Sequence, residues 1–416
     1  MINSDYYSKA EIHCRDCDGS NLMTIVDLGR QPLANALRKN NSDEEITVPL
    51  VLCRCKTCGT IQLNQTVNPD ILFSNYVWVT GTSDGAKNFS EIFSKHLIKR
   101  LEHKNNFIIE IASNDGTFLR PLMQLGHKVL GVEPAKNIAI MASDKGVPTI
   151  NKFFNKSLAE EIVTNHGFAD CIFARNVIPH VANAKDVING IAHCLTEDGI
   201  GAIEFHRVDI ILKDLHYDSI YHEHLYYHSL HSISRLLNLY NLHSYDIEES
   251  PISGGSYVVY FTKRKMPKTA AFESAILKEE ALGVSNLEAW INFSHRVIKH
   301  RDTLRGIVSS LKEQNKKIIA WGASARSSTL LNFCNFTNLD IDAVLDKSVI
   351  KHNLLTPGSN IPILHPDEIK KLVPDIILLL AWNFCDEIVD ELKKKYKWSG
   401  LIIKPLPNLP QLIQII

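Results

Sequence analysis

The chain has 416 residues, of which 45% are hydrophobic and 22% are charged, so it can bury a sizeable core and is not dominated by disorder. Because ordinary domains run to about 100–200 residues, this length predicts two or three domains. Lys and Arg number 45 against 46 Asp and Glu, a net charge of −1, which disfavours a nucleic-acid partner because no global positive field exists to hold a phosphate backbone.

The N-terminal sequence MINSDYYSKAEIHC lacks the basic and apolar segments of a secretion signal. No stretch of the chain reaches about 18 uncharged apolar residues, the length that a membrane-spanning helix needs. We therefore expect a cytoplasmic protein without a membrane partner. Nine cysteines in such a chain favour metal ligation over a disulfide scaffold.

Residues 1–75 are predicted to form a small, loop-rich zinc-binding domain. Two C-x2-C turns, CRDC and the CKTC of CRCKTCG, offer four thiolates that suit the tetrahedral coordination of Zn²⁺: Cys14, Cys17, Cys55 and Cys58. Four cysteines leave no open coordination position, so this zinc would be structural. The alternative is a set of buried, reduced cysteines. Cys53 is expected to be a bystander, because only one residue separates it from Cys55.

Residues 76–264 alternate apolar runs with amphipathic segments, the pattern of a parallel sheet covered by helices. The residues at 187–195 repeat apolar side chains with helical spacing. Strands are predicted at 107–112, 128–133, 170–175 and 199–205. This segment is therefore interpreted as a Rossmann-like α/β domain.

Residues 265–416 are predicted to form a second Rossmann-like domain. The segment 265–312 has a helical pattern and is expected to bridge the two lobes. A strand, a glycine-containing turn and a helix follow at 316–334, and further strands are predicted at 342–346 and 375–382.

The segment EIASNDGTFLRPL, residues 110–122, predicts a strand that ends in a small-residue turn and opens a helix, where a doubly wound sheet binds an adenosine cofactor. It lacks the glycines that a dinucleotide pyrophosphate requires. A carboxylate in GVEPA, at the end of the next strand, can accept both ribose hydroxyls. The candidate cofactor residues are Glu110, Ala112, Asn114, Gly116 and Glu133, together with Asn176 after the third strand. They favour S-adenosylmethionine; NAD and a bare packing turn remain alternatives.

ARNVIPHV, residues 174–181, follows the third strand and places Asn176 and His180 at the same carboxyl edge of the sheet. His180 could equally be a satisfied histidine at the start of a helix.

YHEHLYYHS, residues 221–229, concentrates histidine, tyrosine and glutamate. The His-Glu-x-x-His spacing of a metalloprotease is absent, so a catalytic metal is disfavoured. An acid/base set fits better, in which His224 takes a proton while Glu223 and Tyr221 orient it and steady developing charge. His222 and His228 are expected to face solvent.

These motifs resemble, along essentially the whole chain, the bacterial C-methyltransferases that act on nucleotide-linked keto-deoxysugars. The paired cysteine turns with DLGRQPLAN between them are followed in the family's order by CGTIQL, EIASNDGT, GVEPA, NVIPHV, YDSIYHEHLYYHSL, GGS, AWGASARSSTLLN, PGSNIPI and AWNF.

The resemblance implies methylation of the carbon beside a ketone, C3 next to a C4 ketone in well-known members, through an enolate. By matched position, His224 would be the base, Tyr221 would hydrogen-bond the ketone oxygen and Glu223 would support them. Asn176, His180 and Tyr76 match positions that line the family's substrate pocket. In the C-terminal domain, the turn from Gly322 to Thr329 would lie near the nucleotide phosphates, with Arg326 where lysine is usual.

Three positions depart from the family pattern: Ser253 replaces a histidine, Val258 an arginine and His206 a common proline. They leave the acid/base trio intact, but they leave open which sugar and which nucleotide the enzyme accepts and which carbon it methylates. Rival functions are an oxygen or nitrogen methyltransferase and a zinc-ribbon nucleic-acid binder with a vestigial methyltransferase fold. We expect a monomer.

Overall fold

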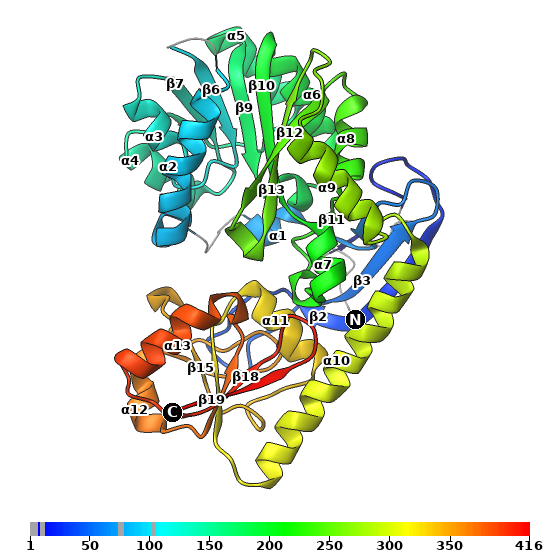
Figure 1. The fold of residues 1–416 in the computed structure, drawn as a ribbon. Helices are drawn as coiled ribbons and strands as arrows, with labels where there is room; N and C mark the ends of the chain where they lie inside the picture. Colours follow the sequence, from blue (N-terminus) through cyan, green and yellow to red (C-terminus); the bar gives the residue numbers. More distant parts are fainter. Residues whose placement is uncertain (1–6, 9–12, 74–78, 102–104) are drawn as a thin grey trace.

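The computed structural model describes residues 7–8, 13–73, 79–101 and 105–416. Its strands form a four-stranded, a seven-stranded and a six-stranded sheet, together with one short two-stranded pair (Figure 1). In Figure 1 the seven-stranded sheet occupies the upper lobe and the six-stranded sheet the lower lobe, and the N-terminal strands lie to one side where the lobes meet. The predicted α/β architecture, with a small N-terminal module and two helix-covered sheets, is confirmed.

The N-terminal sheet has the order β11-β4-β3-β2 and is antiparallel. Its strands are β2 (Leu22–Pro32), β3 (Thr47–Cys55), β4 (Ile61–Leu63) and β11 (Tyr226–Tyr227), while β1 (Tyr7–Ser8) pairs separately with β5 (Thr66–Val67), ahead of α1 (Pro69–Phe73). Strand β11 comes from the histidine-rich segment at 221–229. The cysteine-rich module and the candidate catalytic segment therefore share one sheet.

The seven-stranded sheet has the order β12-β13-β10-β9-β6-β7-β8. Its strands are β6 (Phe107–Ile111), β7 (Lys128–Val132), β8 (Thr149–Ile150), β9 (Ala169–Arg175), β10 (Leu195–His206), β12 (His243–Ser250) and β13 (Ser256–Thr262). Strands β6 to β10 are parallel, and β13 runs antiparallel to β10 and β12. Every residue of β6 is buried, as expected for a parallel strand covered on both faces.

Helices cover both faces of this sheet (Figure 1). On one face, buried side chains of α2 (Asp84–Ile98), α3 (Leu119–Gln124) and α4 (Lys136–Asp144) pack with Ile108, Phe173 and Tyr260. The remaining helices of this lobe are α5 (Lys156–His166), α6 (Ala184–Cys194), α7 (Val208–Asp214) and α8 (Leu230–Asn238). The chain order reverses on the two sides of β6, so the carboxyl end of β6 is the switch point at which such sheets bind ligands.

Two helices join the lobes: α9 (Ala270–Ala281) and α10 (Leu287–Glu313), the long yellow helix in Figure 1. The lower sheet has the order β16-β15-β14-β17-β18-β19, with only β19 antiparallel. Its elements are β14 (Ile318–Trp321), α11 (Ala325–Phe333), β15 (Val344–Leu345), β16 (Ile363–Leu364), α12 (Ile369–Leu372), β17 (Ile376–Leu379), α13 (Cys385–Lys394), β18 (Gly400–Lys404) and β19 (Gln411–Ile415).

Short 3₁₀ helices connect several of these elements: η1 (Thr80–Thr82), η2 (Ile178–His180), η3 (Tyr217–Ser219), η4 (Ile252–Gly254), η5 (Val349–Lys351), η6 (Pro366–Glu368) and η7 (Trp382–Phe384). One continuous cluster of buried apolar side chains includes residues of all three larger sheets, such as Leu50, Ile109 and Ile319. Within the described ranges, no helix has both the length and the apolar character that a membrane crossing requires.

Candidate active site

The turn after β6 has an unusual backbone. Ala112, Asn114 and Gly116 have positive φ angles of 51°, 50° and 74°. Such angles are uncommon outside glycine, and they cluster at ligand-binding sites. Gly116 is needed here for space as well, because a Cβ atom would lie 2.7 Å from a methyl carbon of Val147. The turn therefore brings main-chain groups to the switch point at the end of β6.

Glu133 follows β7 and braces this turn. Its Oε2 accepts a hydrogen bond from the Asn114 N–H at 2.9 Å, and its Oε1 accepts one from the Ala135 N–H at 2.9 Å. The Oδ1 of Asn114 accepts a hydrogen bond from the Thr80 N–H at 2.8 Å. Burial raises the pKa of the Glu133 carboxyl, although the two main-chain donors favour its charged form.

Glu110, on β6, is a buried acid just ahead of the turn. Its Oε2 has no hydrogen-bond partner among the described residues, and burial raises its pKa well above the usual range. A buried, unpaired carboxylate oxygen is costly and suits a ligand that brings a cation, as the ammonium group of S-adenosylmethionine does. Glu110, the turn and Glu133 thus fit this cofactor. Asn176 (φ 53°) follows β9 at the same edge, where its N–H donates to the Glu204 carbonyl.

The candidate acid/base set lies in the segment between η3 and β11. The Nε2 of His224 lies 2.8 Å from the Tyr221 hydroxyl, and its Nδ1 lies 3.0 Å from the Ser219 carbonyl oxygen. A carbonyl only accepts, so Nδ1 carries the proton and Nε2 presents a lone pair to Tyr221. Burial lowers the pKa of His224 well below its usual range, and His180, His206 and Arg326 nearby oppose protonation further.

His180 and Glu223 pack around this set. The His180 ring lies edge-on to that of His224, with 4.7 Å between centroids, and burial lowers its pKa to about 4. Oε1 of Glu223 accepts a hydrogen bond from the Asn35 Nδ2 at 2.6 Å. Asn35 lies in the loop after β2, so the cysteine-rich module orients Glu223.

The expectation that His222 and His228 face solvent is wrong. They are 2% and 1% exposed. The Nε2 of His222 lies 3.1 Å from the Val48 carbonyl oxygen on β3, and the His228 ring stacks on Tyr226 at 5.0 Å. Both side chains are buried because β11 docks this segment against the N-terminal sheet.

The lower lobe reaches the same segment through α11 and η7. The Oγ1 of Thr329 donates to the Ile220 carbonyl at 2.7 Å. Arg326 donates from Nε and Nη2 to the two carboxylate oxygens of Asp218, at 3.1 and 2.8 Å. The Nε1–H of Trp382 donates to the same carboxylate at 2.8 Å. The predicted C-terminal residues therefore lie beside the candidate acid/base set.

Gly322 ends β14 at the start of the predicted phosphate turn. Its φ is 99°, and a Cβ atom there would lie 2.6 Å from the Cβ of Ala381. Because the turn comes so close to the end of β17, only glycine fits at this position. Tyr76 lies outside the described residues. The ligand-binding roles of Gly322, Arg326 and Thr329 stay predictions.

The four cysteines lie together at the end of the N-terminal sheet. Their Sγ atoms are all within 4.8 Å of one another, with Cys14 3.4 Å from Cys58 and Cys17 3.7 Å from Cys55. Tetrahedral zinc with Zn–S bonds of about 2.3 Å sets sulfur atoms about 3.8 Å apart. The cluster thus fits a zinc ion, and Cys53 is not part of it.

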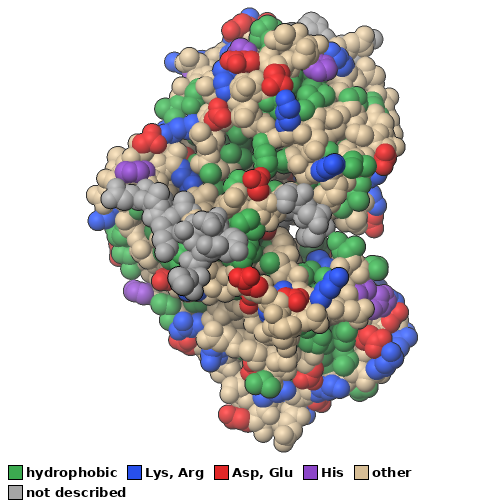
Figure 2. Space-filling view, turned by 180° about the vertical axis from the view of Figure 1, so that it is seen from behind, with side chains coloured by type: hydrophobic (Ala, Val, Ile, Leu, Met, Phe, Trp, Pro, Cys, Tyr) green, Lys and Arg blue, Asp and Glu red, His purple; other side chains and the backbone are tan. Residues whose placement is uncertain are grey.

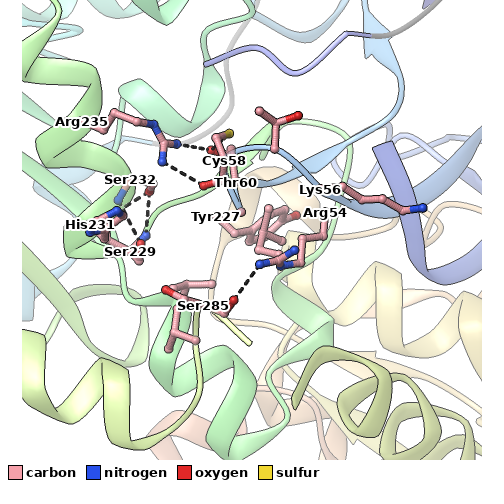
Figure 3. A pocket seen from close by; sticks show the side chains of 15 residues that line it. Arg54, Lys56, Cys58, Thr60, Tyr227, Ser229, His231, Ser232, Arg235 and Ser285 are labelled. Atoms are coloured by element: carbon pink, nitrogen blue, oxygen red, sulfur yellow. Dashed lines mark hydrogen bonds between the residues drawn. The ribbon is translucent and has the colours of Figure 1, made fainter. Parts of the chain in front are cut away.

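A cavity of about 210 Å³ separates the cysteine turn at 55–58 from α8 (Figure 3). Arg235 of α8 crosses at its edge, donating to the Cys58 carbonyl at 2.9 Å and to the Thr60 Oγ1 at 2.6 Å. Its Nη2 also lies 3.0 Å from Asp16. Arg235 thereby ties both cysteine turns to the upper lobe.

Four site residues were missed from the sequence: Asn35, Asp218, Ser219 and Trp382. All lie in motifs that resemble the family, DLGRQPLAN, YDSIYHEHLYYHSL and AWNF. Their place in these motifs was the only sign in the sequence that they belong to the site. Asn35 and Trp382 contact residues far away in the sequence, and Ser219 contributes a main-chain carbonyl, so residue type alone does not identify them.

Comparison with protein families divides the chain into three matches: a zinc binding domain at 14–73, a methyltransferase domain at 88–245 and a C-methyltransferase C-terminal domain at 251–407. The fold and these matches define an S-adenosylmethionine-dependent methyltransferase. The chain is 31% identical over 400 residues to the C-methyltransferase NovU of Streptomyces niveus, which covers 95% of each protein. It therefore belongs to the C-methyltransferase family.

Solved structures with local likeness include the magnesium protoporphyrin IX methyltransferase of Synechocystis with bound S-adenosylmethionine, at 14% identity and TM-score 0.34, covering 42% of this chain and 79% of that one. The CcbJ methyltransferase of Streptomyces caelestis matches at 12% identity and TM-score 0.34, covering 42% and 88%. With such low scores, the family assignment depends on the sequence matches.

Replacing one cluster cysteine should remove the metal. We expect wild-type protein to contain about one zinc ion per chain and C14S to contain almost none, because three thiolates hold Zn²⁺ far less tightly than four. Elemental analysis of desalted protein measures this, and the thermal transition of C14S should fall. The matched control is C53S, which should keep its zinc. Equal zinc in wild type and C14S would contradict the assignment.

Proposed function

We propose that this enzyme transfers a methyl group to the carbon beside the ketone of a nucleotide-linked keto-deoxysugar, C3 beside a C4 ketone, with His224 as the general base. The observation that carries the proposal is the hydrogen-bonded chain from Tyr221 through His224 to the Ser219 carbonyl. It supplies a neutral base and an acidic hydroxyl at one point, which is what enolate formation needs.

His224 is prepared to take a proton at Nε2. Its Nδ1–H is held by the Ser219 carbonyl, which fixes the tautomer and steadies the imidazolium once the proton has moved. The surrounding protein keeps the ring neutral before substrate binds, since burial lowers its pKa. A ketone acidifies the adjacent C–H bond, so an imidazole is a base of suitable strength.

When the sugar is bound, Tyr221 would turn its hydroxyl from His224 Nε2 to the ketone oxygen, which frees Nε2 to take the proton and stabilises the enolate. Glu223, oriented by Asn35, would keep the segment and its neighbouring His180 in place. A bound S-adenosylmethionine supplies the electrophilic methyl group that the substrate carbon takes. Glu110, Ala112, Asn114, Gly116, Glu133 and Asn176 would hold that cofactor at the end of β6.

The substrate class is supported by the ordered family motifs and by the likeness to a C-methyltransferase. We assign residues 1–75 to a structural zinc domain, 76–264 to the methyltransferase core and 265–416 to a domain that helps hold the nucleotide-sugar. Gly322, Arg326 and Thr329 would contribute to the nucleotide side, with Arg326 shared between Asp218 and a phosphate, and His180 and Tyr76 to the sugar side.

The experiment that tests this proposal uses the half-reaction. In D₂O, without S-adenosylmethionine, wild-type enzyme should exchange the proton beside the ketone of one member of a panel of nucleotide-linked 4-keto sugars, as followed by NMR. H224A should exchange it at least about 100-fold more slowly, because the base is gone. The exposed His295, on α10, gives the control H295A, which should exchange normally.

An oxygen or nitrogen methyltransferase needs a base but no enolate, so it would show no such exchange. Absence of exchange with wild-type enzyme across a panel that it methylates would contradict the proposed base chemistry. Methyl gain, measured by mass spectrometry with the cofactor present, identifies the panel member that is the substrate.

The pH dependence should reflect the lowered pKa of His224. The base works only when unprotonated, and its pKa lies well below the usual 6.5, so kcat/KM should stay level from about pH 8 down to about pH 6.5. The fall should begin well below pH 6.5 and become tenfold per pH unit once the pH is below the pKa of His224. An acid limb centred above 6.5 would contradict the assignment of His224 as the base.

A further inference from the structure

Five histidines outside the proposed acid/base set have a buried ring nitrogen without a hydrogen-bond partner among the described residues, and two of them, His206 and His216, stack on each other. His206 and His216 are 8% and 3% exposed, and their rings stack with 5.7 Å between centroids. The Nε2 of His206 and the Nδ1 of His216 make no hydrogen bond within the described part of the chain. An unpaired buried polar atom is destabilising and rare, so an adjacent pair of them indicates a ligand.

The pair lies between the proposed base and the lower lobe. His206 is the last residue of β10, at the carboxyl edge of the upper sheet, and it is near enough to His224 to affect its pKa. His216 precedes η3 and contacts the Trp382 ring edge-on at 4.7 Å. In the space-filling view the outline of the molecule is notched between the upper and lower lobes (Figure 2).

The two rings are uncharged at neutral pH. Burial and the nearby Arg326 lower the pKa of His216 to about 3 and that of His206 well below its usual range. Each neutral imidazole has one donor and one acceptor nitrogen. Such groups suit a hydroxyl, which both donates and accepts, whereas a phosphate calls for cations.

The other three histidines differ in position. His228 stacks on Tyr226 of β11 and His222 reaches the Val48 carbonyl of β3, both on the side of the N-terminal sheet. His180 packs edge-on against His224 itself. His206 and His216 are distinguished because they lie between the proposed base and the lower lobe.

We infer that His206 and His216 bind a ring hydroxyl of the sugar and thereby select which keto-sugars this enzyme accepts. The inference rests on the proposed function, and it adds a specificity-determining pair to it. A sugar that lacks this hydroxyl would leave both nitrogens buried and unpaired, which is how polar sites reject deoxy analogues.

The test compares kcat and KM for the accepted nucleotide-linked 4-keto sugar and for analogues that lack one ring hydroxyl each. Wild-type enzyme should prefer the parent over one analogue by about 10- to 100-fold in kcat/KM. H206F and H216F keep a flat ring but remove the nitrogens, and they should abolish this preference, mainly through a raised KM for the parent. The KM for S-adenosylmethionine should not change.

The matched control is H228F, which removes a buried, unpartnered nitrogen elsewhere and should keep the wild-type preference. H206N serves if H206F does not fold, and it should retain part of the preference. The inference would be overturned if H206F and H216F lowered kcat/KM equally for the parent sugar and for every analogue. A raised KM for S-adenosylmethionine would overturn it too. If wild-type enzyme methylates no keto-sugar, the proposed function fails instead, and the inference falls with it.

Discussion

The buried carboxylate of Asp218 is the contact on which the arrangement of the site depends. It is 1% exposed and receives hydrogen bonds from the Arg326 guanidinium and the Trp382 indole, both in the lower lobe. Removing one partner of a buried ion pair typically costs about 3–5 kcal/mol, since the other charge is left uncompensated. Asp218 immediately precedes Ser219, whose carbonyl holds His224, so the lower lobe fixes the proposed base through one residue of main chain.

The same segment is held from the opposite side by the cysteine-rich module. Strand β11 pairs with β4, Asn35 hydrogen-bonds Glu223, and His222 reaches the main chain of β3. Arg235 adds a tie from α8 to the cysteine turn. The proposed zinc would therefore support the site indirectly, by stabilising the module that makes these contacts. All three parts of the chain therefore contact the segment that holds the candidate site.

The sequence predicts features that short segments determine. Cysteine spacing identifies the four-cysteine cluster, and the apolar run at 107–111 identifies β6, because each depends on neighbouring residues alone. Strands β11 and β4 pair although they lie about 160 residues apart in the sequence, and no local sequence pattern indicates this pairing. The exposure of His222 was mispredicted for that reason, since its partners are carbonyl groups of β3. The unpartnered nitrogens of His206 and His216 likewise become visible only in three dimensions.

Addition of the methyl group to a carbon made nucleophilic by the neighbouring ketone can be followed in the product. The product is formed with ¹³C-methyl-labelled S-adenosylmethionine and the accepted nucleotide-linked keto-sugar, and NMR then locates the label. We expect the labelled methyl to be bonded to the ring carbon beside the carbonyl, with the hydrogen once on that carbon lost. A label on oxygen or nitrogen, or on a carbon that is not beside the ketone, would contradict it.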